Sequence, residues 1–190
     1  MRTYKKDSCI TFRSTKDYFG GLSNMAPGYP LKINEIWIKS AEALYQSLKY
    51  PNNPEIQKRI IYSNSPISAK RISRYYSSFE RKDWLEVRFK VMRFCIELKL
   101  FQNKERFSKV LLTTSDLPIV EYTTDDKIWG AVDKGDYYEG VNALGRLLME
   151  LRENFKKNPT NFFIETPNMV DLKLLNIDLT AYFSTVNNLQ

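Results

Sequence analysis

The stretch that most constrains the fold is the long amphipathic segment at residues 84–102. Its apolar side chains recur every three or four residues, at Trp84, Val87, Val91, Phe94, Cys95 and Leu98. This period places them on one face of an α-helix. No apolar run approaches the roughly 18 residues that a membrane span needs. We therefore expect the helix to pack into the core of a globular domain.

Capping residues and prolines predict shorter helices before and after this one. Ser40 is a good N-cap for a helix over residues 41–50, which Pro51 ends. Prolines at the first helical turn predict helices over residues 54–62 and 66–76. Apolar periodicity extends the helical region through residues 107–112 and predicts a further strong helix over residues 142–155.

The remaining segments predict short strands and loops. Strands are expected at residues 10–15 and 117–122, and a hairpin at 31–38 with its turn at Asn34-Glu35. Residues 18–30 and 125–138 are expected to be loops, and residues 172–182 a short helix or strand. The predicted fold class is α+β and predominantly helical. It consists of one compact domain over residues 1–155, with an extension over 156–190 packed on it.

The absence of histidine limits the chemistry of this chain. It excludes Ser-His-Asp and Cys-His catalysis and any histidine-based metal site. Cys9 and Cys95 lie far apart and form no ligand pair, so no metal and no cofactor is expected. Acid–base chemistry must therefore come from carboxylates, lysine, tyrosine or water. The N-terminal residues contain no apolar signal core, and we expect a cytoplasmic protein.

The net charge of +7 is unevenly distributed along the chain. Residues 58–93 carry ten Lys or Arg against three acids, whereas residues 116–139 carry seven acids against two lysines. The basic segment fits a partner rich in phosphate, but solvated helix faces give the same pattern.

The predicted helix over residues 41–50 carries a polar stripe. The spacings i, i+3, i+4 and i+7 place four polar side chains on one face, and these are Glu42, Tyr45, Gln46 and Lys49. This stripe is either a solvated surface or the wall of a site. As a site residue, Glu42 would lie in the first helical turn, where the helix dipole favours the ionised carboxylate. Lys49 would be a candidate for attack on a sugar carbon to form a Schiff base.

Two further features precede the last strong helix. Gly140, Asn142 and Gly145 lie at its start, where glycines permit close approach of a phosphate, although they also serve helix packing. Trp129 follows Asp125 and Asp126 in a loop, a context that favours stacking on a base or a sugar.

The order of several long motifs resembles the NADAR family, also described as YbiA-like. The resemblance covers residues 10–155 and is carried by the following segments: SxxDYFGGLSNMAPGYPLKIN, SAEALYQSLKYP, SPISAKR, KDWLEVRFKVMRFCIELKL, LLTTSDLPIVEYTTDDKIWG and GVNALGRLLMELRENF. The form of the segment that begins SAEALYQ resembles the members found beside DNA ADP-ribosyltransferase toxins, where they act as antitoxins. Many YbiA-like members have histidine after the glutamate, whereas this chain has Ala43.

Membership in this family implies N-glycosidase activity on a ribose-linked nitrogen. The expected reaction is removal of ADP-ribose from ADP-ribosylated guanine, in a nucleoside or in DNA, with a cognate toxin encoded nearby as a possible partner. One alternative is cleavage of phosphorylated intermediates of riboflavin biosynthesis. A second alternative is an inactive module that only binds nucleic acid.

A hypothesis for this reaction gives roles to individual residues. The catalytic candidates are Glu42, Lys49 and Asp126. Glu42 or Asp126 would stabilise the positive charge on the sugar, and Trp84 and Trp129 would sandwich a base. The full set of substrate-binding candidates is Arg13, Ser23, Asn24, Gln46, Trp84, Trp129, Gly130, Gly140 and Asn142.

Overall fold

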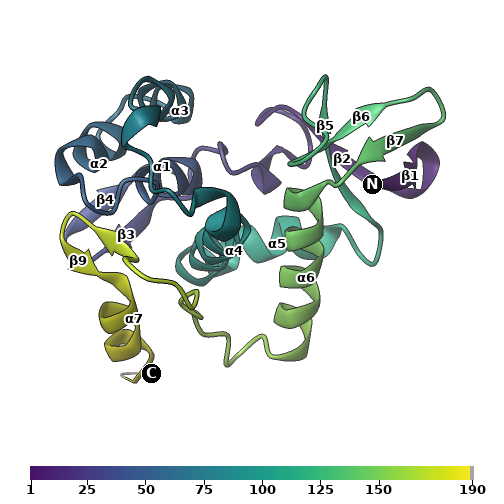
Figure 1. Ribbon diagram of the computed structural model, residues 1–190. Helices are drawn as coiled ribbons and strands as arrows, with labels where there is room; N and C mark the ends of the chain where they lie inside the picture. The colour runs from purple at the N-terminus through teal and green to yellow at the C-terminus, as the bar shows by residue number, and fades with distance from the viewer. Residues whose placement is uncertain (189–190) are drawn as a thin grey trace. The chain divides into compact units, whose positions relative to one another are not determined.

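A computed structural model describes residues 1–188 of the chain, in an α+β fold that confirms the predicted class. Its contacts divide it into two units, drawn together in Figure 1. The sheet unit comprises Met1–Ala26 and Asn103–Phe162, and the helical unit comprises Pro27–Gln102 and the chain from Phe163 onward. Among the described residues, no helix is long and apolar enough to traverse a bilayer.

The sheet unit is built on five strands in the order β1-β7-β6-β5-β2. Strand β5 (Ile119–Thr123) runs parallel to both of its neighbours, the edge strand β2 (Ile10–Phe12) and the central strand β6 (Ala131–Asp133). At the far side, β7 (Tyr137–Gly140) pairs antiparallel with both β6 and β1 (Arg2–Lys5). The loop predicted over residues 125–138 is therefore wrong at Ala131–Asp133 and from Tyr137, which form β6 and β7, because β7 pairs with the distant N-terminal strand β1 and holds β6 beside it.

Two helices pack in the sheet unit beneath these strands (Figure 1). Helix α6 (Ala143–Lys157) lies against β5, and α5 (Lys104–Thr113) lies against α6. Helix and strand approach so closely that a Cβ added to Gly145 would collide with the carbonyl oxygen of Ile119. Glycine is thus required at this position for packing.

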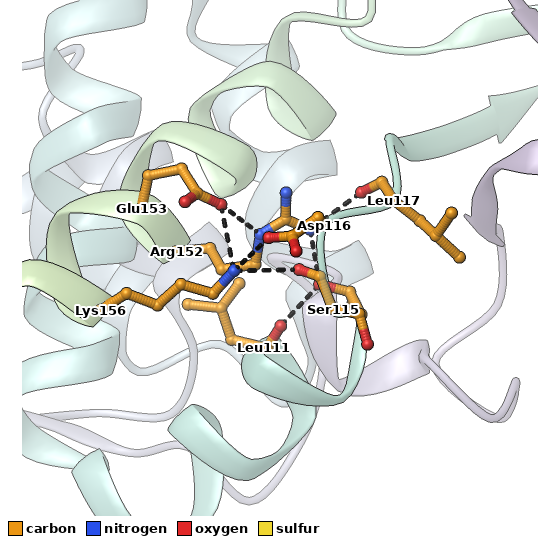
Figure 2. A network of polar contacts seen from close by, with 8 residues as sticks. Leu111, Ser115, Asp116, Leu117, Arg152, Glu153 and Lys156 are labelled. Atoms are coloured by element: carbon orange, nitrogen blue, oxygen red, sulfur yellow. Dashed lines mark hydrogen bonds and ion pairs between the residues drawn. The ribbon is translucent and has the colours of Figure 1, made fainter.

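A buried arginine joins α6 to the turn that follows α5 (Figure 2). The guanidinium of Arg152 donates to the hydroxyl of Thr114 at 2.9 Å and to the carbonyl of Leu117 at 2.8 Å. One turn later, the ammonium of Lys156 binds the carboxylate of Asp116 at 2.6 Å. These contacts fix the path of the chain into β5.

The helical unit holds α1 (Ala41–Ser47) and the α2 and α3 helices, each packed on the other two. Helices α2 (Pro54–Ile61) and α3 (Pro66–Tyr75) begin at the predicted prolines, and α4 (Trp84–Gln102) has the predicted bounds. Helix α4 packs on α1 and on the hairpin of β3 (Leu31–Ile33) and β4 (Ile36–Ile38). The hairpin turn lies where it was predicted, with Asn34 at a φ of 52°.

The C-terminal segment packs on the same unit. It forms β8 (Lys173–Leu174), β9 (Ile177–Asp178) and α7 (Leu179–Asn188). The side chain of Gln57 donates to the carbonyl of Lys173 at 2.8 Å and accepts from the amide of Leu175 at 2.7 Å. Since the contacts divide the chain after Phe162, the proposed domain boundary at residue 155 stays a prediction.

Candidate active site

The polar stripe lies on α1 (Ala41–Ser47), which opens as predicted at Ser40. The Ser40 hydroxyl accepts a hydrogen bond from the amide of Ala43 at 3.2 Å. The helix ends at Ser47, three residues earlier than expected, because Pro51 disfavours helical geometry before it and the amide of Tyr50 closes a turn on Ser47. Lys49 therefore lies in this turn and not on the helix itself.

Glu42 is a buried carboxylate, with only 6% of its surface exposed. Its Oε1 accepts a hydrogen bond of 2.8 Å from Nε2 of Gln46, one helical turn further along. Gln46 is itself buried, so this hydrogen bond orients Glu42 in an environment with little water. A fixed charge acts more strongly there than on the surface. The solvated-surface interpretation of the stripe is thus wrong for Glu42 and Gln46.

The charge of Glu42 affects the pKa of two neighbouring groups, the Tyr45 phenol and the Cys95 thiol. Burial raises the pKa of the Tyr45 phenol, and the negative charge of Glu42 raises it further. Burial and the same charge also raise the pKa of the Cys95 thiol. Both the Tyr45 phenol and the Cys95 thiol therefore stay protonated at neutral pH.

Lys49 lies beside the start of α4. Its ammonium pairs with Oε2 of Glu80 at 3.1 Å and lies 5.1 Å from the ring centroid of Trp84. Trp84 is buried, and its ring also packs on Tyr45 at a centroid distance of 4.9 Å. The prediction that Trp84 stacks on a base finds no support, because its ring is covered by these two side chains. Trp84 instead positions Lys49.

A surface cavity of about 400 Å³ adjoins this cluster in the helical unit. Glu80 is one of its walls, together with Arg81, Asp83 and Asp171. Both Arg81 and Asp83 are fixed there by a bidentate ion pair, with N–O distances of 2.6 and 2.8 Å. The cavity is in the size range of small-molecule sites. The helical unit thus brings Lys49 together with Glu80 and Trp84, and Glu80 lines the open space.

The sheet unit holds Asp126 and Trp129 in the turn after β5. Oδ1 of Asp126 accepts hydrogen bonds from the amides of Ile128 at 2.9 Å and Trp129 at 2.8 Å. This contact closes a side-chain turn that fixes the half-buried Trp129. A Cβ on the adjacent Gly130 would collide with the carbonyl oxygen of Glu121, so strand packing requires that glycine.

The predicted substrate contact of Asn142 is not supported by its surroundings. The side chain is fully buried, donating to the carbonyl of Ile119 at 2.8 Å and accepting from the amide of Glu121 at 3.1 Å. Both ends of the amide are thus used to fasten the start of α6 to β5. A Cβ on Gly140 would likewise collide with the carbonyl oxygen of Gly130, so this glycine serves packing between strands.

The remaining candidates lie in the N-terminal part of the sheet unit. The guanidinium of Arg13 lies 5.3 Å from the ring centroid of Tyr122 and is exposed to solvent. Ser23 and Asn24 are buried in the loop after Gly20–Leu22. Their assignment to substrate stays a prediction. Across residues 1–188, no three His, Cys, Asp or Glu side chains are grouped as a metal site.

Sequence reasoning missed Glu80 and the role of Tyr45. Glu80 is 31 residues from Lys49, so no local pattern joins them. The one available signal was an acid inside a strongly basic segment. Tyr45 was visible on the helix, but its contact with Trp84 depends on the packing of α1 on α4.

Comparison with known proteins then identifies the family. The NADAR domain model matches residues 11–156, which is most of the chain. The chain belongs to the NADAR family. The predicted resemblance is confirmed at this level, and the matched residues include every candidate named above.

Individual relatives agree with this family. The chain is 36% identical over 148 residues to N-glycosidase YbiA of Escherichia coli, covering 78% of this chain and 89% of that protein. It is 30% identical to N-glycosidase Npun_R5314 of Nostoc punctiforme, covering 77% and 92%. The solution structure of E. coli YbiA matches with a TM-score of 0.69 at 35% identity, covering 80% of this chain and 88% of that one.

A second group of relatives is longer. The chain is 33% identical to Riboflavin biosynthesis protein VVA0006 of Vibrio vulnificus, covering 83% of this chain and 41% of that protein. It is also 33% identical to the chloroplastic Riboflavin biosynthesis protein PYRR of Zea mays, covering 75% and 24%. In both of these comparisons, this chain therefore matches less than half of the relative's length.

Proposed function

We propose that this protein removes ADP-ribose from ADP-ribosylated guanine, in a nucleoside or in DNA, and reverses the modification made by a DNA ADP-ribosyltransferase toxin. The coarser assignment is an N-glycosidase, a hydrolase of N-glycosidic bonds. It follows from membership in the NADAR family and from relatives that are named N-glycosidases. The finer assignment adds the substrate.

The observation that carries the chemistry is the buried Glu42 carboxylate, held by Gln46 at 2.8 Å. Cleavage of an N-glycosidic bond develops positive charge on the anomeric carbon and the ring oxygen, as in glycoside hydrolysis. A fixed carboxylate shielded from water stabilises such a charge without reorganising. Glu42 therefore suits this role better than Asp126, whose Oδ1 already accepts two backbone hydrogen bonds.

Lys49 supplies a route through a covalent intermediate. Before attack its ammonium must lose a proton, and Glu80 at 3.1 Å is placed to accept it. The bond between the anomeric carbon and the guanine nitrogen breaks, the nitrogen takes the proton that Glu80 accepted, and Nζ of Lys49 bonds to the carbon. Opening of the sugar ring then gives a Schiff base. Water hydrolyses it, which releases ADP-ribose and restores the lysine.

The charge of the chain supports an anionic substrate. The net charge is +7, and its positive excess lies within residues 58–93, which also include Glu80 and Trp84 of the candidate site. A diphosphate such as that of ADP-ribose would be attracted to this segment. The same charge suits a substrate embedded in DNA.

A specific observation also favours one alternative. The relatives from Vibrio vulnificus and Zea mays are named riboflavin biosynthesis proteins. Phosphorylated intermediates of that pathway also contain a ribose-linked nitrogen, so the same carboxylate and lysine would serve their cleavage.

One comparison of substrates tests the proposal. The protein is incubated with ADP-ribosylated guanosine, with an oligonucleotide carrying ADP-ribosylated guanine, and with a phosphorylated riboflavin-pathway intermediate, and products are separated by chromatography. We expect ADP-ribose and unmodified guanine from the first two. Cleavage of the third substrate alone would overturn the proposal and establish the alternative. If none of the three substrates is cleaved, the remaining interpretation is an inactive module that only binds nucleic acid.

A further inference from the structure

A second cluster of residues, separate from Glu42 and Lys49, lies on the outer side of α2 and α3. It surrounds a surface hollow of about 560 Å³. We name it the tyrosine–arginine surface, and its members are Arg59, Tyr62, Arg71, Ile72, Tyr75 and Tyr76. All six come from α2, α3 and the residues that follow these helices, so the surface lies wholly within the helical unit.

The charge of this surface is positive throughout. Residues 56–79 contain five Lys or Arg and no acid. Arg59, Arg71 and Arg74 are exposed, and among residues 1–188 no carboxylate forms an ion pair with any of them. The guanidinium groups therefore remain available to an anionic partner.

The aromatic rings of this surface are exposed in a way that core residues are not. Tyr75 is 81% exposed and Tyr62 is 55% exposed. Tyr75 packs edge-on against Tyr76 at a centroid distance of 4.9 Å. Tyr76 is in turn held by Arg59, whose Nη1 donates to the phenol oxygen at 2.9 Å. The lining of the hollow thus includes one ring held by its neighbours, Tyr76, and two exposed rings, Tyr62 and Tyr75.

We propose that the tyrosine–arginine surface binds a single-stranded nucleic acid. Bases would stack on Tyr62 and Tyr75 while phosphates bind Arg59 and Arg71. That this strand carries the substrate base rests on the proposed function. The binding of the strand to this surface does not depend on that function. It would make the preferred substrate a modified strand and not a free nucleoside.

The combination of features favours this occupant. Proteins that bind single strands without strong sequence preference pair a positive groove with exposed aromatic rings, because every base has a face that stacks. An acidic protein surface would be attracted to the arginines but would leave the two tyrosine rings without stacking partners. In a duplex the bases are already stacked on one another, so the rings favour the unpaired strand.

Binding of unmodified strands to the full-length protein provides the test. Fluorescence anisotropy measures the Kd of a labelled single-stranded DNA, of the same sequence as duplex, as RNA, and as an abasic strand. We expect single strands to bind more tightly than the duplex, and affinity to fall as salt rises. Comparison of the DNA strand with the RNA strand shows which of the two nucleic acids the surface prefers. The abasic strand keeps the phosphates but lacks the bases. If it binds more weakly than the complete strand, the difference measures the contribution of base stacking.

Matched variants locate the site. Tyr75→Ala and Tyr62→Ala should each weaken binding by roughly 10-fold, in line with the usual contribution of one stacked base. Tyr18→Ala is the control, since Tyr18 is 85% exposed and packs edge-on against Phe19 at 4.8 Å, as Tyr75 does against Tyr76. Arg71→Glu should weaken binding at least as much, whereas Lys109→Glu on α5 should leave it unchanged. Circular dichroism verifies that each variant is folded.

The outcomes separate this inference from the proposed function. If the Tyr62, Tyr75 and Arg71 variants bind as the wild type does, or if the wild type binds no strand, the inference is overturned whatever the protein cleaves. If they weaken binding but no ADP-ribose is released from any substrate, only the proposed function fails. If both hold, Tyr75→Ala should raise KM for the modified oligonucleotide and leave cleavage of ADP-ribosylated guanosine unchanged.

Discussion

The amide of Gln46 holds the carboxylate of Glu42 at 2.8 Å, one turn apart on α1, and both side chains are buried. A buried charge needs such a partner, because an unpaired carboxylate away from water is unstable. The hydrogen bond leaves Oε2 of Glu42 as the second acceptor of the carboxylate. The hydrogen bond from Gln46 thus stabilises the Glu42 carboxylate and fixes its orientation.

Glu42→Gln is expected to lower kcat by about 100-fold or more while the protein stays folded. The substitution keeps an acceptor for Gln46 but removes the charge that stabilises the sugar cation, an effect of about 3 kcal/mol in comparable sites. Steady-state release of the free sugar product measures it. Glu55→Gln is the matched control, since Glu55 occupies the first turn of α2 and is exposed. Near-normal turnover by Glu42→Gln would move the role to Asp126.

Lys49 should be trapped covalently if the reaction passes through a Schiff base. Borohydride added during turnover would reduce the imine to a stable amine, and mass spectrometry of peptides would locate the sugar on Lys49. Lys49→Met should abolish the adduct and the turnover. Lys6→Met is the control, because Lys6 also pairs with a carboxylate, Asp133 at 2.7 Å, and lies 5.3 Å from the ring of Tyr138. Rapid turnover without any adduct would indicate direct attack by water.

Local sequence signals predicted much of the helical unit. The Ser40 cap, the prolines at the starts of α2 and α3, and the apolar period of α4 each depend on neighbouring residues, and each was correct. The early end of α1 was missed because the turns before Pro51 compete closely with a last helical turn. The sheet was harder, since β1 pairs with β7 across more than a hundred residues and no local pattern encodes that contact.

In the candidate site, too, contacts between neighbouring residues could be predicted and contacts between distant residues could not. Glu42 and Gln46 lie one turn apart, so their spacing already placed them together. The partner of Lys49 is Glu80, which only the packing of distant segments brings near. Asn142 was misassigned for a related reason. A polar residue beside glycines at a helix start resembles a phosphate site in sequence, whereas its amide fastens α6 to β5.

Arg152→Met is expected to lower the free energy of unfolding by about 3 kcal/mol. It would leave the Thr114 hydroxyl and the Leu117 carbonyl without the buried donor that binds both, while the methionine keeps most of the packing. Urea denaturation followed by circular dichroism measures the change. Arg152→Lys should recover little, because an ammonium cannot reproduce the guanidinium fork. Arg146→Met on the same helix is the control, and an equal loss there would contradict the assignment to this network.

Glu97 on α4 should make the protein less stable as pH rises. Burial raises the pKa of Glu97 to about 7, with Arg93 opposing the shift and Glu165 adding to it. Between about pH 4.5, where this group titrates in the unfolded chain, and pH 7, the folded state therefore binds the extra proton. Its contribution to stability is complete below that range and is lost as pH rises through 7, an effect of up to about 3 kcal/mol.

Glu97→Gln tests this sign directly, because the amide mimics the protonated acid at every pH. Urea unfolding at pH 4, below the pKa of this group in the unfolded chain, should give nearly equal stabilities for the variant and the wild type, whereas at pH 8 the variant should be the more stable by about 3 kcal/mol. Glu86→Gln, exposed on the same helix, should follow the wild type at both pH values. A Glu97→Gln variant that is less stable than the wild type at pH 8 would show that the ionised carboxylate contributes favourable contacts in the folded state.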